Sequence, residues 1–356
     1  MKELLKNPFT PTFGSIPLQL AGRDRIMRDI LDGLNNGPGD PNRATIFVGA
    51  RGSGKTVLLA KIAEEASANG WISVNVNAAS DMLDEVLIQI KDNAKAGVSV
   101  SRDVSQSDFK TTWRSEMTAI VKELNEKNVG LLITVDELDV RIDELRTVIT
   151  TFQHFVRERR DVALIMAGLP SKVSNLLRED SISFLRRAFQ HNLEAIEESE
   201  VRFSMKKTIE LAGRTIEKEA LSLAVEKTKG FPFMIQLIGY QMWRQNPEIN
   251  SISFEDAEEG IILAKHDLER MIFDITYREL SEKDIAFLTA MLADKEYSNI
   301  SDISKRMNVS PKYAGIYRKR LIEQGIISSI GYGKVAFDLP MFREYIQSRN
   351  HSPYFL

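Results

Sequence analysis

The sequence contains no cysteine and only four histidines. Disulfides and thiolate metal sites are therefore excluded, and the scattered histidines show no metal-ligand spacing. No apolar run approaches the roughly 20 residues that a membrane-spanning helix needs. The first residues, Met1–Lys6, lack the apolar core of a signal peptide. These absences predict a soluble cytoplasmic protein with no membrane partner.

A strong charge of either sign is also absent. The formal net charge is −3 over 356 residues, with 43 % hydrophobic and 27 % charged residues. Such a composition is typical of globular proteins, and any surface for nucleic acid must be a local patch. Because the chain is too long for one compact core, two or three domains are expected.

The stretch Gly49–Thr56 has the Walker A pattern G-x-x-x-x-G-K-[ST]. The apolar run Ala44–Val48 precedes it and Val57–Ala63 follows with helical spacing, so the loop should join a strand to a helix. Backbone N–H groups of such a loop and the helix dipole bind phosphates. Lys55 would reach the β- and γ-phosphates, and the Thr56 hydroxyl would ligate Mg²⁺. The predicted binding residues here are Gly49, Ala50, Arg51, Gly52, Ser53, Gly54, Lys55, Thr56 and Val57.

A continuous apolar run, Val129–Glu137, ends in two acids and predicts a central parallel strand of Walker B type. Its carboxyl end should lie at the same sheet edge as the Walker A loop. Asp136 would hold Mg²⁺ and Glu137 would act as general base toward the attacking water. The alternative is a pair of solvated carboxylates; pairing with Walker A favours the functional interpretation. Asp139, two residues further, is the second candidate for the base.

The order of periodicities predicts an α/β fold: a three-layer P-loop NTPase domain with a parallel sheet over residues 1–197. A helical lid domain (198–280) and a C-terminal winged helix-turn-helix domain (281–356) should follow. The predicted strands of the first domain are Ala44–Val48, Trp71–Asn77, Val129–Glu137, Asp161–Gly168 and Asn192–Ile196. The predicted lid helices cover roughly 201–213, 217–229, 232–245 and 254–279. Residues 97–108 are polar and aperiodic, which indicates a loop.

The predicted winged helix domain carries a local excess of positive charge. From Ser281 to Leu356 there are 11 Lys and Arg against 8 Asp and Glu, and no acid lies between Ile303 and Ile322. A basic recognition helix, Pro311–Gln324, suits phosphate contact in a major groove of double-stranded DNA. The residues predicted to contact DNA are Lys312, Arg318, Lys319, Arg320 and, at the wing, Lys334.

In these motifs and their order the chain resembles AAA+/STAND-type ATPases of the origin-recognition-like group. The motifs are Ala21–Asp24, Gly49–Thr56, Val135–Glu137, Ser183–Phe189, Gly230–Pro232 and the winged helix. The resemblance covers nearly the whole chain. It implies an ATP/ADP-binding, Mg²⁺-dependent ATPase domain, a lid and a winged helix.

The resemblance also implies residue roles. Pro17, Leu20, Ala21 and Arg23 would lie near the adenine, and Pro232 of the lid would pack on the base. A plain break between two helices explains Gly230–Pro232 equally well, and both can hold.

Arg186 and Arg187 lie between strands four and five. Either could be an arginine finger for a neighbouring subunit in a homo-oligomer formed on ATP binding. An exposed basic pair is the alternative.

Two departures from the family pattern favour slow hydrolysis. The fourth strand ends Met166–Pro170 without a polar sensor residue, and the G-x-P lid replaces a sensor arginine. The first hypothesis is a nucleotide-controlled DNA-binding switch. The alternative is a STAND-type signalling ATPase whose winged helix packs on the ATPase domain and serves autoinhibition or protein contacts.

Overall fold

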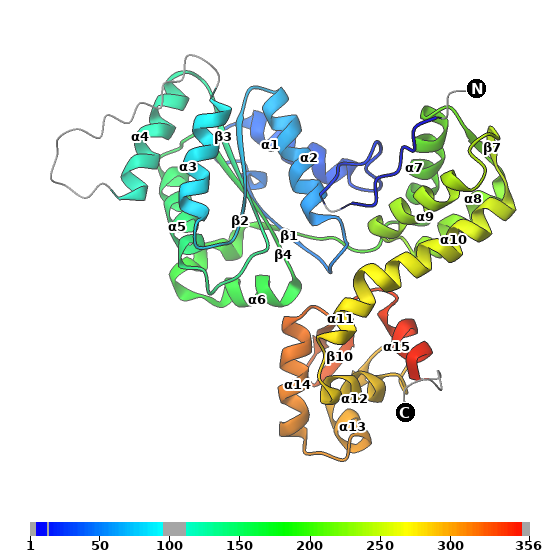
Figure 1. The fold of residues 1–356 in the computed structure, drawn as a ribbon. Helices are drawn as coiled ribbons and strands as arrows, with labels where there is room; N and C mark the ends of the chain where they lie inside the picture. The colour runs from blue at the N-terminus through cyan, green and yellow to red at the C-terminus, as the bar shows by residue number, and fades with distance from the viewer. Residues whose placement is uncertain (1–4, 13, 95–111, 351–356) are drawn as a thin grey trace.

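The first domain is built on a parallel sheet of five strands in the order β2–β3–β4–β1–β5 (Figure 1). The computed structural model describes residues 5–12, 14–94 and 112–350; the predicted loop 97–108 lies outside them. The strands are β1 (Ala44–Val48), β2 (Ile72–Asn77), β3 (Leu131–Asp136), β4 (Val162–Gly168) and β5 (Phe189–Asn192). The three-layer P-loop architecture is confirmed.

Helices cover both faces of this sheet. One face packs on α1 (Asp24–Asn36) and α2 (Lys55–Ala68). The other packs on α3 (Met82–Asn93), α4 (Trp113–Glu126), α5 (Asp143–Arg157) and α6 (Pro170–Arg178). Every residue of β3 and β4 is buried. Burial from both sides explains why these strands are apolar throughout instead of alternating.

The predicted fifth strand, Asn192–Ile196, was wrong in position. The strand spans Phe189–Asn192 and pairs with β1 at the edge of the sheet. It is polar and mostly exposed, so no apolar pattern marks it in the sequence. Leu193 and Ile196, which suggested a strand, instead enter two different hydrophobic cores. Helix α6 and the 3-10 helix Asp180–Arg187 were not predicted.

The lid contains the four expected helices. They are α7 (Glu198–Leu211), α8 (Lys218–Thr228), α9 (Pro232–Gln245) and α10 (Phe254–Leu268), with a short parallel pair, β6 (Thr215–Ile216) and β7 (Ser251–Ile252). Helix α10 runs on through a π-helix, Glu269–Phe273, into α11, Asp274–Arg278. One long helix over 254–279 was expected, and the π turn was missed. The N-terminal segment packs here too: Phe9 is 2 % exposed and lies against Gly239 of α9.

The winged helix prediction is confirmed in element order. Its elements are α12 (Glu282–Met291), β8 (Ser298–Asn299), α13 (Ile300–Arg306), α14 (Pro311–Glu323), β9 (Ile327–Gly331), β10 (Lys334–Phe337) and α15 (Phe342–Asn350). The strands form an antiparallel sheet in the order β8–β10–β9. Strand β8 and helix α15 are additions to the predicted set.

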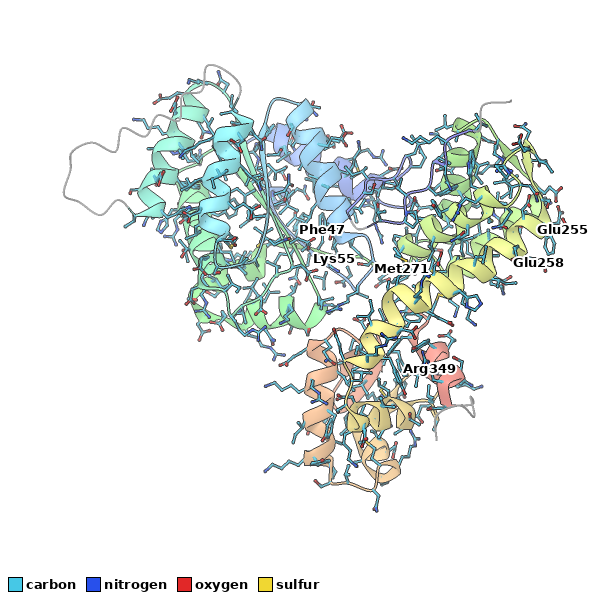
Figure 2. The ribbon with its side chains drawn as sticks, viewed as in Figure 1. Phe47, Lys55, Glu255, Glu258, Met271 and Arg349 are labelled. Atoms are coloured by element: carbon cyan, nitrogen blue, oxygen red, sulfur yellow. The ribbon has the colours of Figure 1, made fainter. Side chains whose placement is uncertain are left out.

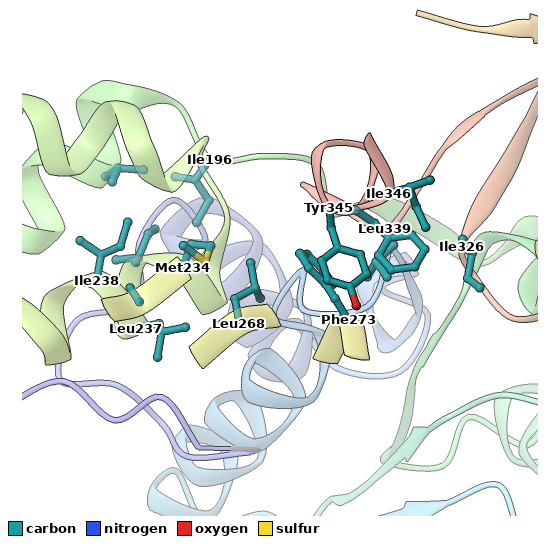
Figure 3. Packing of buried hydrophobic residues seen from close by; sticks show 14 of the residues in the cluster. Ile196, Met234, Leu237, Ile238, Leu268, Phe273, Ile326, Leu339, Tyr345 and Ile346 are labelled. Atoms are coloured by element: carbon teal, nitrogen blue, oxygen red, sulfur yellow. The ribbon is translucent and has the colours of Figure 1, made fainter. Parts of the chain in front are cut away.

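A single apolar core runs from the lid into the winged helix (Figure 3). Leu268 lies beside lid residues, and Phe273 from the π-helix contacts the rings of Phe342 and Tyr345, with centroids 5.3 and 5.2 Å away. The two cores of the sheet domain contain no described residue beyond Leu193. Across the described ranges, no helix is long and apolar enough to cross a membrane.

Candidate functional site

The Walker A loop joins the end of β1 to the start of α2. Gly52 and Gly54 adopt the left-handed region, with φ of 77° and 89°, which glycine adopts without steric cost. A Cβ on Gly52 would lie 3.1 Å from the ring of Phe231 in the lid. The Lys55 ammonium donates to the carbonyls of Gly49 and Ala50 at 3.0 and 2.9 Å. The loop is thus closed around its own lysine and touches the lid.

The two predicted magnesium ligands lie side by side. The Thr56 hydroxyl donates to Oδ2 of Asp136 at 2.5 Å, and Asp136 is 7 % exposed. Its other oxygen accepts from the Glu137 N–H at 2.8 Å. A hydroxyl and a carboxylate suit Mg²⁺, which usually takes one or two protein ligands together with phosphates and water. No group of three or more His, Cys, Asp or Glu among the described residues could hold a metal alone. Metal binding here would depend on nucleotide.

Glu137 follows Asp136 with a φ of 55° and projects, exposed, at the cavity described below. Left-handed backbone is uncommon for glutamate and often marks a functional position. The alternative base, Asp139, is held instead by Arg141 and Lys172, at 2.6 and 2.9 Å. These partners keep its pKa far below the usual value, so Asp139 is a poor proton acceptor. Glu137 is the better placed base.

A cavity of about 540 Å³ lies where the sheet domain, the lid and the winged helix meet. We call it the central cavity. Figure 2 shows Lys55 and Met271 near the place where these three parts approach one another. Its volume is within the range of small-molecule sites. The predicted site residues that line it are Pro17, Leu20, Ala21, Arg23, Arg51, Gly52, Ser53, Gly54, Lys55, Thr56, Val57, Glu137 and Pro232.

The predicted nucleotide-binding residues that do not line the cavity, Gly49, Ala50 and Asp136, are hydrogen-bonded to residues that do. Gly49 and Ala50 accept hydrogen bonds from Lys55, and Asp136 accepts one from Thr56. Arg23 is 9 % exposed and donates to the Glu194 carbonyl at 2.7 Å, and burial lowers its pKa. Arg23 therefore also ties the entry segment to the sheet domain.

Sequence reasoning missed much of the opposite wall. It comes from the lid, the π-helix and the winged helix: Phe231, Phe233, Met234, Met271, Ile272, Phe273, Leu339, Pro340 and Met341. The phenylalanines flank the recognised Pro232 and could have been inferred from it. Nothing in the pattern of the others marks a site, because they meet the Walker A loop only through the packing of three domains.

Acidic groups from two domains act on Lys55. Burial lowers the pKa of its ammonium, while Asp136, Glu137 and Asp338 act in the opposite direction. Asp338 follows β10 in the winged helix. Burial raises the pKa of its carboxyl group, and the charge of Lys55 opposes that rise. A winged-helix carboxylate is thus part of the electrostatics of the Walker A lysine.

Arg186 and Arg187 do not line the central cavity. Arg186 donates to the Leu177 carbonyl at 2.8 Å and borders a separate hollow beside β5. Arg187 is exposed. Neither is thereby placed to act on a nucleotide bound in the central cavity of the same chain.

Of the predicted DNA-contact residues, some are exposed and others have partners within the winged helix. Lys312 and Lys319 are exposed on α14. Arg318 donates to the Ser329 hydroxyl at 2.8 Å, and Lys334 lies 4.4 Å over the ring of Tyr297. Arg320 is engaged within its own domain, because it donates to the buried Asp284 at 3.0 Å and to Ser281. Loss of Arg320 would leave a buried carboxylate without its cation.

Comparison with known proteins is informative about the fold. A family described as a domain of unknown function (DUF8462) matches residues 270–346, from the π-helix to α15. No curated protein matches the chain.

Among solved structures, the Aeropyrum pernix ORC2 protein in its ADPNP–ADP complexes is 17 % identical, with 98 % of this chain and 100 % of that chain covered and a TM-score of 0.60. Cdc6p from Pyrobaculum aerophilum is 15 % identical over 98 % and 100 %, with a TM-score of 0.53. The chain shares the fold of these proteins, and the predicted resemblance to the origin-recognition-like AAA+ group is confirmed at that level.

Proposed function

We propose that the protein is an ATP-binding, slowly hydrolysing ATPase that acts as a nucleotide-controlled DNA-binding switch. One observation carries the proposal: the Walker A loop, the lid and the winged helix all line a single cavity. A ligand bound there contacts all three domains, so its chemical state can influence how the winged helix is held. The ORC2 protein of the same fold was solved with ADPNP and ADP, which supports adenine nucleotides as the ligand class.

The residue roles follow from the chemistry of phosphoryl transfer. Lys55 and the loop N–H groups would hold the β- and γ-phosphates. Thr56 and Asp136 would hold Mg²⁺, which when bound neutralises charge on the phosphate oxygens. Glu137 would orient a water and accept its proton. Pro17, Leu20, Ala21 and Pro232 offer apolar surface for the base. The end of β4 and the residue after it, Ala167–Leu169, carry no polar side chain, which supports slow turnover.

DNA is the proposed partner of the exposed side of α14. Its C-terminal end approaches α6, while its N-terminal half projects away from the sheet domain (Figure 1). Lys312 and Lys319 lie exposed on this helix, where phosphate contacts would position the domain. Arg186 or Arg187 would serve as arginine finger in a homo-oligomer, since neither lines the cavity of its own chain.

Nucleotide binding by the full chain is the first test. Lys55→Ala should remove measurable ATP binding, because the Walker A lysine is the cation that serves the β- and γ-phosphates in this class of loop. Thr289→Ala, distant in the winged helix, is the control. Unchanged affinity in a folded Lys55→Ala variant contradicts the site.

DNA binding with ATP, with ADP and without nucleotide tests the switch. If three phosphates are neutralised, log K should fall against log salt with a slope of about −3. Lys312→Ala with Lys319→Ala should flatten this slope and leave ATP binding intact. Absence of DNA binding at low salt in every nucleotide state rejects the DNA part.

A STAND-type signalling ATPase is the second candidate. The observation favouring it is that the winged helix contacts the sheet domain: the Ser171 hydroxyl donates to the Ile322 carbonyl at 3.2 Å. ATP-dependent self-assembly without DNA binding, measured by light scattering, supports this candidate over the first.

A further inference from the structure

The two edge strands of the five-stranded sheet, β2 and β5, differ in how their outer sides are covered. On an edge strand every second residue turns its N–H and C=O away from the sheet, where another strand can pair with them. On β2, Gln89 of α3 accepts from the Asn75 N–H at 2.8 Å and donates to the Asn75 carbonyl at 2.7 Å. Asn93 donates to the Ser73 carbonyl at 2.8 Å. Side-chain amides thus close the β2 edge.

The β5 edge is open. The Leu193 N–H, directly after β5, donates to the Val48 carbonyl of β1 at 2.7 Å. Because residues of a parallel ladder alternate, the backbone groups of Gln190 and Asn192 then face away from β1. Within the described ranges, no group forms a hydrogen bond with these outward N–H and C=O groups. The strand therefore offers two residues for pairing with a further strand.

A hollow of about 360 Å³ lies between this edge and α6. We call it the edge pocket. The side chains of Gln190 and Asn192, the same two residues whose backbone groups face outward, line one side of it. Val173 and Leu177 of α6 give it an apolar part. A strand added beside β5 would place alternate side chains next to those of Gln190 and Asn192, at this pocket.

The edge pocket is positively charged. Its lining includes Arg178 and Arg186 and contains no acidic residue. Arg178 forms no ion pair with a carboxylate in the part of the chain that the structure describes. Arg186 lies 3.7 Å from Asp180, whose side chain is fully exposed. Because exposed pairs of this kind are weak, both guanidinium groups can take an incoming carboxylate.

Charge at an edge can also serve only to keep other strands away. Such a role needs no pocket, and the β2 edge shows that this chain can close an edge with two amides of a neighbouring helix. The β5 edge instead combines free backbone groups with a hollow that has an apolar part and two arginines. This combination is that of a peptide site in which backbone pairing gives affinity and a side-chain pocket gives specificity.

We propose that the β5 edge and the edge pocket bind an extended acidic segment of another protein, which adds as a further strand beside β5. Its backbone pairs with the outward groups of Gln190 and Asn192, and carboxylates on alternate residues pair with Arg178 and Arg186. Arg187 does not line the edge pocket and remains the candidate arginine finger. The proposal involves neither nucleotide nor DNA, so it can fail without affecting the proposed function.

Binding of a synthetic peptide to the full chain tests the proposal. The probe is a fluorescein-labelled peptide in which glutamate alternates with valine, followed by fluorescence anisotropy. It should bind saturably, and a peptide with glutamine in place of glutamate should bind about 2- to 25-fold more weakly, the loss expected for two exposed charge pairs. A peptide with proline in place of valine keeps the carboxylates but cannot pair as a strand, and it should not bind.

Variants of the chain test the two parts of the site separately. Gln190→Pro removes an outward N–H that β1 does not use, so it should abolish peptide binding and leave the sheet folded by circular dichroism. Arg178→Gln and Arg186→Gln should each weaken binding about 2- to 5-fold. Arg187→Gln, exposed in the same segment and outside the pocket, is the matched control and should keep the parental affinity. If Gln190→Pro does not fold, the proline peptide still tests strand pairing.

Several results would overturn the proposal. Absence of saturable binding by the parent rejects the site, and equal affinity for the glutamate and glutamine peptides rejects an acidic partner. Undiminished binding of the proline peptide, or of the glutamate peptide to folded Gln190→Pro, rejects strand addition. If the parent self-associates in sedimentation and Gln190→Pro abolishes this, the edge serves a second copy of the chain and the proposed partner is wrong.

Discussion

The winged helix meets the rest of the chain at two junctions of different character. Toward the lid it shares one apolar core, which passes through Leu268 and Phe273. Toward the sheet domain it offers a hydrogen bond to Ser171, a close approach to Leu169 and the cavity-lining residues Leu339, Pro340 and Met341. A junction made of buried apolar surface resists separation. A junction made of a few local contacts can respond to a ligand.

The comparison indicates which parts move together. We infer from the shared core that lid and winged helix move as one unit and that the sheet domain forms the other. The central cavity lies between the two units, so a ligand bound there would contact both. The following predictions either break one junction or sharpen the contrast between them.

The largest effect is expected on the rate of ATP hydrolysis when the proposed base, Glu137, is replaced. Glu137→Gln keeps the size of the side chain and removes the base, so hydrolysis should fall about 10²- to 10⁴-fold. Phosphate release measures the rate, and ADPNP binding should remain as in the parent. Parental turnover would mean that another group activates the water.

The variant also sharpens the comparison. Because the chain has no cysteine, labels can be attached to introduced cysteines. With ATP bound and not hydrolysed, a pair of labels on α6 and α14, across the Ser171 junction, should separate, while a pair across the Phe273 junction should not. Separation of both pairs would show that lid and winged helix do not form one unit.

Breaking the apolar junction should give the next largest effect, a loss of free energy of unfolding. Phe273 is 2 % exposed and contacts two aromatic rings of the winged helix. Phe273→Ala should lower the free energy of unfolding by about 3–5 kcal/mol, measured by urea denaturation. Ile262→Ala is the control, because Ile262 on α10 is 52 % exposed, and it should change stability by less than about 0.5 kcal/mol. A small effect at Phe273 would refute a shared core.

Weakening the junction between the winged helix and the sheet domain should have a smaller effect, and it should change docking instead of global stability. Ser171→Ala removes the hydrogen bond to the Ile322 carbonyl, which is worth about 0.5–1.5 kcal/mol net. The equilibrium constant for docking should fall about 2- to 10-fold, measured from the distance between labels on α6 and α14, with the unfolding midpoint nearly unchanged. Ser174→Ala, exposed on the same helix, should leave docking as it is. A large loss of global stability would place Ser171 in a structural core instead.

The smallest effect is expected for an ion pair between the lid and α15. Lys229 and Glu344 form it with side chains 53 % and 51 % exposed. A double-mutant cycle should give less than about 1 kcal/mol, decreasing as salt is raised. A larger, salt-resistant value would mean that the lid junction is held by charge as well as by apolar packing.

Local patterns were sufficient for much of the fold and part of the site. Gly49–Thr56 and Leu131–Glu137 could be recognised because phosphate and metal chemistry demands those residue types in sequence order. The helices of the lid and three helices of the winged helix, α12, α13 and α14, were predictable from apolar periodicity. Strand β5 was misplaced because an exposed edge strand of polar residues carries no apolar signal. The π-helix at Glu269–Phe273 was missed because its residues suit an ordinary helix equally well.

The sequence by itself determined the Walker A loop, the two acids after β3 and the order of the three domains. These features depend on short-range backbone geometry and on residues adjacent in the chain. Tertiary structure alone decided which acid is free: Lys172, 33 residues from Asp139, takes that carboxylate and leaves Glu137 at the cavity. It also decided that Arg320 donates to the buried carboxylate of Asp284. Such pairings arise from packing between distant segments, where a side chain's role depends on neighbours that the local sequence does not specify.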